Sequence, residues 1–329
     1  MSSVTVAEVG DDSVRPFQVE GLDVRGRAVS LGSSLDEILQ KHDYPEPVAR
    51  LLGEAILLTT LFGTSLKHES RFIFQTNTNG PVSLIVVDYR APGDLRGYAR
   101  FDAEAVAAAV KADEPSLLGT GHLAMTIDQG SDMDRYQGIV ALEGTTLEEA
   151  VHQYFAQSEQ LPTRIRIAVA EMVSRSDTGS ARSRWRGGAV MVQFLPDKPE
   201  RLRTRDLPGG DNPNAGEGVE AEDAFAEDDA WFEARSIAET IEDHELTDPE
   251  IGPDRLLYRL FHERGVRVFE SKPIRHNCRC SRDKIRTVIE QFPAAERQDM
   301  VQDGHIVVTC EFCNSVYRFA PSEFDAADG

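Results

Sequence analysis

The residues best suited to chemistry in this chain are its four cysteines, which all lie near the C-terminal end. They form two close pairs, Cys278 with Cys280 and Cys310 with Cys313, and the segment between the pairs is long enough to let them converge. Two short cysteine pairs joined by a longer segment are typical of a tetrahedral zinc site with four thiolate ligands. We therefore expect these four sulfurs to hold one Zn²⁺ ion.

Other uses of the same thiols fit the sequence less well. Permanent disulfides need an oxidising compartment, and residues 1–8 carry neither the basic stretch nor the apolar core of an export signal. A catalytic dithiol has the spacing of Cys310 and Cys313, but such motifs usually join a strand to a helix in a βαβ unit, which is not the context here. We expect His276 and His305 outside the metal shell, because four thiolates already fill it.

The segment that carries the cysteines, residues 272–320, is too short to fold on an apolar core alone. A bound metal is therefore the natural source of its stability. In comparable zinc modules, metal binding contributes about 10 to 16 kcal/mol to folding. Loss of the metal should unfold this segment.

The negative charge of the chain is unevenly distributed along its sequence. The chain has 329 residues, of which 40% are hydrophobic, and no apolar run of membrane-spanning length. Its net charge of -21 is concentrated in residues 206–250, which contain sixteen acidic residues and one basic residue. The beginning of this acidic stretch is also rich in glycine and proline and cannot bury apolar surface, so we predict a disordered insert there.

Before this insert, the pattern is a mixture of helix and strand. Apolar residues recur at helical spacing around most of the circumference of residues 45–67, which predicts a central, buried helix. A further helix is expected over residues 146–157, with Thr146 as its cap and Glu149 three residues later. Strands separated by turns, which favour antiparallel hairpins, are predicted at residues 71–76, 82–89, 97–101, 122–127, 136–142 and 164–173.

The sequence therefore predicts an α+β protein without a βαβ rhythm. We expect an N-terminal domain of mixed helices and antiparallel sheet, a helical linker and a small C-terminal zinc-binding domain. The expected boundaries are a disordered tail at 1–14, the α+β domain at 15–200, the acidic insert at 201–230, the linker at 231–271, the zinc domain at 272–320 and a tail at 321–329.

The N-terminal domain contains no recognisable catalytic motif. It has no phosphate-binding loop and no nucleophile elbow, and its polar residues do not follow a known catalytic spacing. Gly187 and Gly188 mark a point where two backbones can approach closely. We expect no enzyme, although the following residues could in principle form acid–base pairs: Asp88, Asp128, Asp132, Asp134, His152 and Glu159.

Several stretches together resemble the 33 kDa chaperonin family, the redox-regulated holdases. The resemblance runs from about residue 17 to residue 319, and the acidic insert at 209–229 is longer than the family requires. The stretches that carry it are Tyr136-Gln137-Gly138-Ile139-Val140, Tyr154-Phe155-Ala156-Gln157-Ser158-Glu159-Gln160, Gly187-Gly188 through Gln193 and Pro196, residues 256–269, and the two cysteine motifs followed by Tyr317 and Phe319.

This resemblance implies a thiol-controlled chaperone that does not hydrolyse nucleotides. In the reduced cytoplasm the four thiolates would hold zinc. Peroxide or hypochlorite, combined with unfolding conditions, would pair Cys278 with Cys280 and Cys310 with Cys313 and release the metal. Basic residues beside the first pair, Arg279, Arg282 and Lys284, are expected to favour the thiolate form. The resemblance also implies that the active form is a dimer.

The linker is where we expect this switch to control binding. It contains many apolar residues among its acids, enough to pack when it is folded and to contact unfolded proteins when it is released. A helix diluted by acidic residues suits such a transition. The expected client-binding residues are Trp231, Phe232, Ile237, Ile241, Leu256, Leu257, Leu260 and Phe261.

Two alternatives belong to other functional classes. A zinc ribbon that binds nucleic acid would use the basic residues near the cysteines, Arg275, Arg279, Arg282, Lys284 and Arg286, yet residues 272–319 carry only eight basic against six acidic residues. Binding to phosphate backbones needs a larger excess of positive charge. A thiol oxidoreductase is the other alternative. We therefore expect unfolded proteins as partners, and neither nucleic acid nor membrane.

Overall fold

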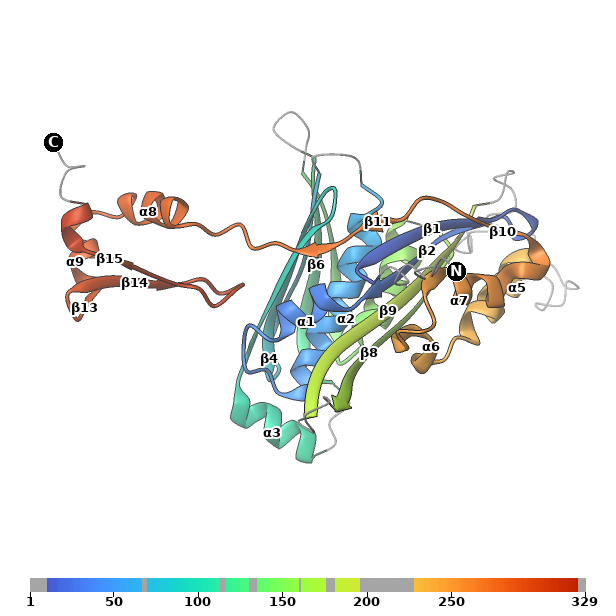
Figure 1. Ribbon diagram of the computed structural model, residues 1–329, viewed down its shortest axis with the longest axis horizontal. Helices are drawn as coiled ribbons and strands as arrows, with labels where there is room; N and C mark the ends of the chain where they lie inside the picture. Colours follow the sequence, from blue (N-terminus) through green and yellow to red (C-terminus); the bar gives the residue numbers. More distant parts are fainter. Residues whose placement is uncertain are drawn as a thin grey trace, which may run out of the picture.

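The computed structural model describes residues 11–66, 70–112, 116–129, 135–159, 161–175, 181–195 and 228–324. In this part of the chain it contains two six-stranded sheets and a three-stranded sheet near the C-terminal end (Figure 1). The expected tails, apart from residues 11–14 and 321–324, and the expected insert, apart from residues 228–230, lie outside these ranges. Among the helices described, none has the length and hydropathy needed to cross a bilayer.

The first sheet has the strand order β10-β1-β2-β9-β8, with β11 also paired to β1, and all of its pairings are antiparallel. It therefore joins the beginning of the chain to a segment near the C-terminal end. Its strands are β1 (Ser13–Val19), β2 (Val24–Leu31), β8 (Thr163–Arg175), β9 (Ala181–Phe194), β10 (Val266–Val268) and β11 (Lys272–Pro273).

The second sheet has the order β12-β5-β4-β3-β6-β7. Its five long strands are antiparallel, and the short β12 adds in parallel at the edge. These five strands confirm the five strands predicted between residues 71 and 142. The strands are β3 (Arg71–Thr78), β4 (Val82–Arg90), β5 (Asp94–Phe101), β6 (Thr120–Asp128), β7 (Tyr136–Glu143) and β12 (Arg275–His276).

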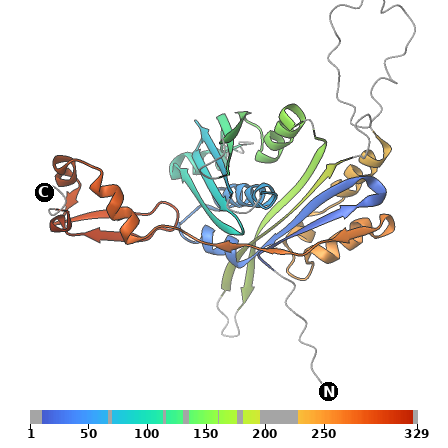
Figure 2. The same ribbon diagram turned by 90° about the horizontal axis from the view of Figure 1, so that it is seen from above.

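Helix α2 (Glu46–Gly63) lies between the two sheets (Figure 2) and contacts strands of both, which confirms the predicted central helix. Its side chains are buried around most of the circumference. The predicted cap of α4 (Leu147–Tyr154) is also confirmed, because Thr146 and Glu149 form a reciprocal capping box. The N-terminal domain is completed by α1 (Ser33–Leu39), α3 (Ala103–Lys111) and a π-helical turn, η2 (Phe155–Glu159).

The linker begins as three helices, α5 (Asp229–Glu239), α6 (Asp243–Thr247) and α7 (Pro253–Phe261), followed by a short 3₁₀ turn, η5 (His262–Arg264). The helices contact β1, β2, β8 and β9 of the first sheet. The chain then becomes extended, and it contributes β10 and β11 to the first sheet and β12 to the second before it reaches the cysteines.

The residues after β12 form a small C-terminal unit, which we call the cysteine module (residues 277–324). Its own core contains four buried apolar side chains, Ile289, Ile306, Phe319 and Phe324. Such a small core agrees with the expectation that this unit needs another source of stability. Its elements are α8 (Arg282–Glu290), α9 (Ala294–Asp299), β13 (Val301–Gln302), β14 (His305–Thr309), β15 (Val316–Phe319) and the turn η6 (Pro321–Glu323).

The first sheet is apolar on both faces. Along β9, Ala189 and Met191 belong to the main core around α2, whereas Val190 and Val192 belong to a separate cluster beneath α5–α7. We call this second cluster the outer core. Because successive side chains of a strand point to opposite faces, a strand buried on both sides carries an uninterrupted apolar run. Burial on both faces explains the sequence of β9.

The glycine pair before this run allows the expected close approach of backbones. A Cβ atom at Gly188 would lie only 2.2 Å from the backbone oxygen of Leu246 in α6. Any side chain here would push α6 away from the sheet. The close packing of the linker on the first sheet therefore depends on glycine at this position.

Candidate metal centre

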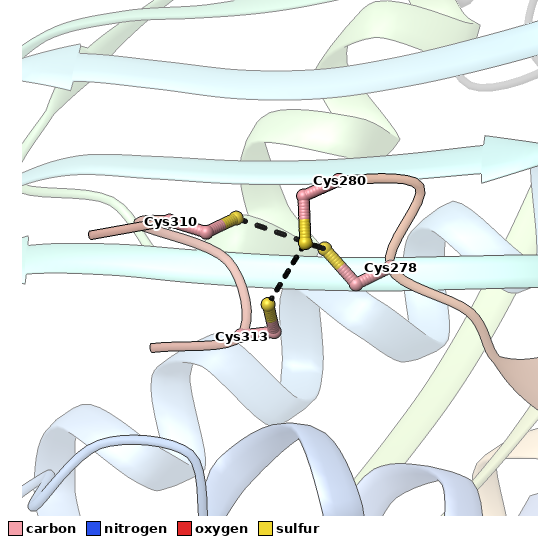
Figure 3. A group of neighbouring side chains, drawn as sticks. All are labelled: Cys278, Cys280, Cys310 and Cys313. Atoms are coloured by element: carbon pink, nitrogen blue, oxygen red, sulfur yellow. Dashed lines mark hydrogen bonds between the residues drawn. The ribbon is translucent and has the colours of Figure 1, made fainter. Parts of the chain in front are cut away.

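The four cysteines meet between two loops of the cysteine module, as Figure 3 shows. Cys278 and Cys280 lie on the segment that connects β12 to α8, and Cys310 and Cys313 lie on the turn between β14 and β15. Hydrogen bonds close this turn, because the amide of Cys310 donates to the carbonyl of Ser315 and the amide of Asn314 donates to the carbonyl of Cys310. The β-hairpin therefore presents both of its sulfurs to the first pair.

The sulfur geometry fits a tetrahedral metal ion. Sγ–Sγ distances are 3.5 Å for Cys278 to Cys280, 3.7 Å for Cys278 to Cys310 and 3.3 Å for Cys280 to Cys313, and all four sulfurs lie within 4.8 Å of one another. A zinc–sulfur bond of about 2.3 Å gives a tetrahedron with edges of about 3.8 Å. All four thiols are free. The cluster can therefore hold a metal ion of the size of zinc.

The two nearby histidines lie outside the sulfur cluster. Nδ1 of His276 lies 3.3 Å from a carboxylate oxygen of Glu37, and Nδ1 of His305 lies 3.2 Å from the carbonyl oxygen of Asp303. The contacts of these rings are thus with oxygen atoms of the protein.

The environment of the thiols affects their ionisation unequally. Burial raises the pKa of Cys280 to about 12, even though the Tyr317 hydroxyl donates a hydrogen bond to its sulfur at 3.1 Å. Burial likewise raises the pKa of Cys310. At Cys313 burial is outweighed by hydrogen bonds to Ser315 and to the neighbouring thiols, which lower its pKa to about 6.

The prediction that Arg279, Arg282 and Lys284 favour the thiolate form is wrong for Cys280, because burial raises its pKa. Each of these cations also has another partner. Arg282 forms an ion pair with Glu323 at 2.8 Å. The ammonium group of Lys284 donates to the backbone oxygen of Arg279 at 2.9 Å. The guanidinium group of Arg279 is directed at the N-terminal domain.

Arg279 forms an ion pair with Asp88 in β4 of the second sheet. The side chain of Asp88 is fully buried, and Arg71 and Arg96 also contact it, each at 2.8 Å. Burial opposes ionisation of this carboxyl, but hydrogen bonds from Arg71 and the charges of both of these arginines outweigh burial and lower its pKa. Asp88 therefore remains ionised and forms a socket for the residue between Cys278 and Cys280.

The residues between the other two cysteines also contact the N-terminal domain. The guanidinium group of Arg96 lies 4.0 Å from the centre of the Phe312 ring. Glu311 forms an ion pair with Arg100 at 3.1 Å, and its carbonyl oxygen lies 2.7 Å from Nε2 of His42. Every spacer residue of the two cysteine motifs thus touches the α+β domain. The sequence does not predict these contacts, and only the position of Arg279 between two cysteines hints at them.

The polar residues considered as acid–base candidates do not converge where the structure describes them. Asp88 lies in the arginine cluster, and Asp128 forms an ion pair with Arg135 at 3.6 Å. His152 accepts a hydrogen bond from the amide of Ile165, and burial lowers its pKa to about 4. Glu159 accepts a hydrogen bond from Tyr154. Asp132 and Asp134 lie outside the described residues.

The apolar residues predicted for the linker mostly face the first sheet. Six are buried in the outer core, Ile237 is partly buried, and only Phe232 is largely exposed, at 53%. Their partners include strand aromatics, since Phe261 stacks on Phe17 and Trp231 lies against Phe194. The buried six are Trp231, Ile241, Leu256, Leu257, Leu260 and Phe261.

The basic residues considered for nucleic-acid binding are largely neutralised by carboxylates. Arg275 pairs with Asp94 at 2.6 Å, and Arg286 pairs with Glu323 at 2.7 Å. Arg279 and Arg282 have the acidic partners described above. A phosphate backbone would have to displace these partners, so the arrangement does not favour the nucleic-acid alternative.

The fold and the site define a class of thiol proteins. Its members combine an antiparallel-sheet domain, a helical cover on the outer face of that domain and a docked four-thiol module. The chain belongs to the Hsp33 family, whose model, described as Hsp33 protein, matches residues 12–320. The resemblance found in the sequence is therefore confirmed, and the family assigns a chaperone function.

Curated relatives and a solved structure agree with this assignment. A 33 kDa chaperonin of Caulobacter vibrioides (strain NA1000 / CB15N) is 46% identical over 316 residues, which cover 94% of this chain and 95% of that protein. One from Ectopseudomonas mendocina (strain ymp) is 34% identical over 322 residues, covering 97% and 94%. The crystal structure of the 33 kDa chaperonin from Thermotoga maritima has the same fold, with a TM-score of 0.68 at 20% identity, covering 96% of this chain and 97% of that one.

Proposed function

We propose that this protein is a redox-regulated, ATP-independent holdase that binds unfolding proteins in the cytoplasm. One observation carries the proposal: the linker helices bury an apolar cluster on the first sheet that is separate from the main core. A cover of this kind can leave without opening the domain beneath it. The reduced, covered form would be inactive, and the uncovered form would bind clients.

The sensor in this proposal is the cysteine module. In the reduced protein, Cys278, Cys280, Cys310 and Cys313 would hold zinc, which would supply the stability that four buried apolar side chains cannot provide. The sulfur distances described above support this assignment. The module would then stay folded and docked through its spacer residues.

Oxidation would remove the ligands. Each pair of thiolates would give up two electrons to one molecule of hydrogen peroxide, which would take two protons from the solvent, so that one S–S bond forms, the O–O bond breaks and two molecules of water leave. The family resemblance pairs Cys278 with Cys280 and Cys310 with Cys313. Sulfurs that are bonded to each other no longer serve as four thiolate ligands, and the module would unfold.

The signal must then travel along the chain, because the cysteine module and helices α5–α7 lie at opposite ends of the molecule (Figure 1). The segment between them is extended and pairs with β1 through β10 and β11, and with β5 through β12. These short strands offer few hydrogen bonds. Once Arg279, Glu311 and Phe312 no longer dock, the strands would detach, and the linker helices would follow.

The released surface would be the binding site. It would include apolar residues of the first sheet, such as Phe17, Val190 and Phe194, together with those of the linker itself. Large exposed apolar patches bind unfolded chains and also promote association between copies. An oxidised homodimer is therefore part of the proposal.

The test measures zinc, free thiols and chaperone activity on one sample, before and after treatment with warm peroxide. We expect about one zinc ion per chain to be lost as four thiols disappear, and only the oxidised form to suppress aggregation of a heat-denatured client without ATP. Zinc that stays bound, or equal activity of the reduced form, would reduce the metal to a purely structural role.

A further inference from the structure

A cavity remote from the cysteines lies between the two sheets and has a volume of about 320 Å³. Its walls are mostly apolar and come from both sides: Phe72 of β3 and Ile127 of β6 from the second sheet, Met191 of β9 from the first, and Phe62 of α2. An apolar cavity with a few polar groups is the usual form of a site for a small ligand or a chain end.

Several sequence stretches that the redox switch does not use meet at this cavity. Tyr136, Tyr154 and Glu159 line it, and the two tyrosine hydroxyls lie 3.1 Å apart while Tyr154 donates to Glu159 at 2.7 Å. A Cβ atom at residue 138 would lie 2.5 Å from the Tyr154 ring, so Gly138 allows this ring to lie against β7. The π-helical turn Phe155–Glu159 completes the wall, and such turns often occur at functional sites.

Two arginines add positive charge to the cavity. Arg25 and Arg27 of β2 line it and lie opposite Gln193 and Met191 in the strand register. In the part of the chain that the structure describes, the Arg27 side chain makes no hydrogen bond or ion pair, and its Nε atom is buried. Burial, and then the charge of Arg25, lower the pKa of Arg27. A buried polar atom without a hydrogen bond is costly, and a ligand that accepts from Nε would remove this cost.

We propose that this cavity binds an amphipathic carboxylate, with Arg27 receiving the carboxylate group and the aromatic and methionine walls enclosing the apolar body. A guanidinium group suits this role because its planar fork matches a carboxylate. The ligand chemistry has two sources, a small fatty-acid-like molecule or the C-terminal end of a polypeptide with apolar last residues. The site is independent of the redox switch, since its lining residues lie outside the linker and the cysteine module.

Titration calorimetry on the reduced full-length chain tests the proposal, with decanoate as the probe and decanol as its uncharged match. We expect one decanoate per chain, bound about tenfold or more tightly than decanol, because a charge-assisted hydrogen bond is worth at least that factor. Arg27→Gln should remove this preference. Arg267→Gln, on β10 of the same sheet and outside the cavity, should retain it.

The outcome that overturns the proposal is equal affinity of the natural chain for decanoate and decanol, or a preference that survives Arg27→Gln in a variant with an unchanged melting temperature. Competition then separates the two sources. Displacement of decanoate by a peptide ending in Leu-Phe with a free carboxylate, but not by its amide, supports the site and assigns it to polypeptide ends. Failure of both peptides to displace decanoate supports the site for small carboxylates.

Discussion

The two faces of the first sheet carry covers of different kinds. On the inner face, α2 is packed between two sheets and buries side chains around most of its circumference. On the outer face, α5–α7 pack on the first sheet and keep one side in solvent, as the exposed Phe232 and Tyr258 indicate. The same strands therefore support one cover that belongs to the fold and another that lies on its surface.

The attachment of the outer cover explains how it can be removed. Its rim is held by ion pairs such as Arg15 with Asp254 and Arg264 with Glu233, and exposed pairs of this kind contribute at most about 1 kcal/mol each. Loss of α2 would open both sheets, whereas loss of α5–α7 would leave the main core intact. Under the proposed function, the regulated surface is one face of an ordinary sheet with a detachable cover.

The largest expected effect comes from removal of the sensor. In a Cys278→Ser and Cys310→Ser double variant, two of four ligands are lost, and with them about 10 kcal/mol or more of metal-dependent stability. We expect zinc content, measured by atomic emission, to fall from about one per chain to near zero, and chaperone activity to become independent of peroxide. The conservative Thr287→Ser in α8 of the same module should keep its zinc. Full zinc content in the double variant would refute the site assignment.

A matched pair of leucine variants compares the two covers directly. Leu57 in α2 and Leu257 in α7 are both completely buried, so replacement of either by alanine should cost about 2 to 5 kcal/mol. Leu257→Ala weakens the detachable cover and should make the reduced protein suppress aggregation. Leu57→Ala weakens the main core and should lower the melting temperature without activating the reduced form. If the two variants gain equal activity, the distinction between the covers fails.

Glu54 of α2 should make the stability of the protein depend on pH. Burial, and then the charge of Glu148, raise its pKa from 4.5 to about 7, and Asp243 of the linker adds to this effect. Because the folded-state pKa is raised, the favourable contribution is complete below about pH 4.5 and is lost as the pH rises to about 7, a change of about 3 kcal/mol. Urea unfolding at pH 5 and 7.5 measures it.

Glu54→Gln should remove most of this pH dependence. Glu46→Gln is the control, because Glu46 lies on the same helix and its side chain is exposed. Equal pH dependence in the natural chain and in Glu54→Gln would assign the effect to other groups.

The smallest predicted effect concerns docking of the cysteine module. Arg279→Gln removes one of three guanidinium groups from Asp88, which keeps Arg71 and Arg96, so the N-terminal domain should stay intact. Loss of about 1 kcal/mol of docking should speed activation by peroxide about fivefold. Arg282→Gln, which loses an ion pair within the module, serves as the control for module stability. Identical activation rates for Arg279→Gln and the natural chain would show that docking does not restrain the switch.

Much of the fold could be predicted because its signals are local. The strands β3–β7 alternate in pattern and are separated by turns, and the capping box of α4 is a signature that spans four residues. Strands β1, β2 and β9 are not among the predicted strands. In β2, Arg25 and Arg27 occupy the cavity-facing positions and weaken the apolar alternation. The face of the first sheet that the linker covers depends on tertiary packing. Hydrophobic periodicity along the sequence carries no information about such packing.

The candidate site was likewise predictable only in part. Cysteine spacing alone predicts the cluster of four sulfurs, because short pairs on tight loops converge easily. The docking of the module was not predictable, since Arg279 and Asp88 are 191 positions apart and each has an ordinary surface-type identity. The ligand-binding cavity was equally hidden, although the tyrosine stretches that line it stood out in the sequence.

Hydrogen exchange of the amides in α2 and in α5–α7 distinguishes detachment of the linker helices from opening of the whole domain. In the reduced, zinc-loaded chain both sets should be protected. After oxidation by warm peroxide, the amides of α5–α7 should exchange at least about a hundredfold faster while those of α2 keep their protection, as expected when one cooperative unit opens and another does not. An oxidised chain that binds clients while α5–α7 remain as protected as α2 would contradict the account.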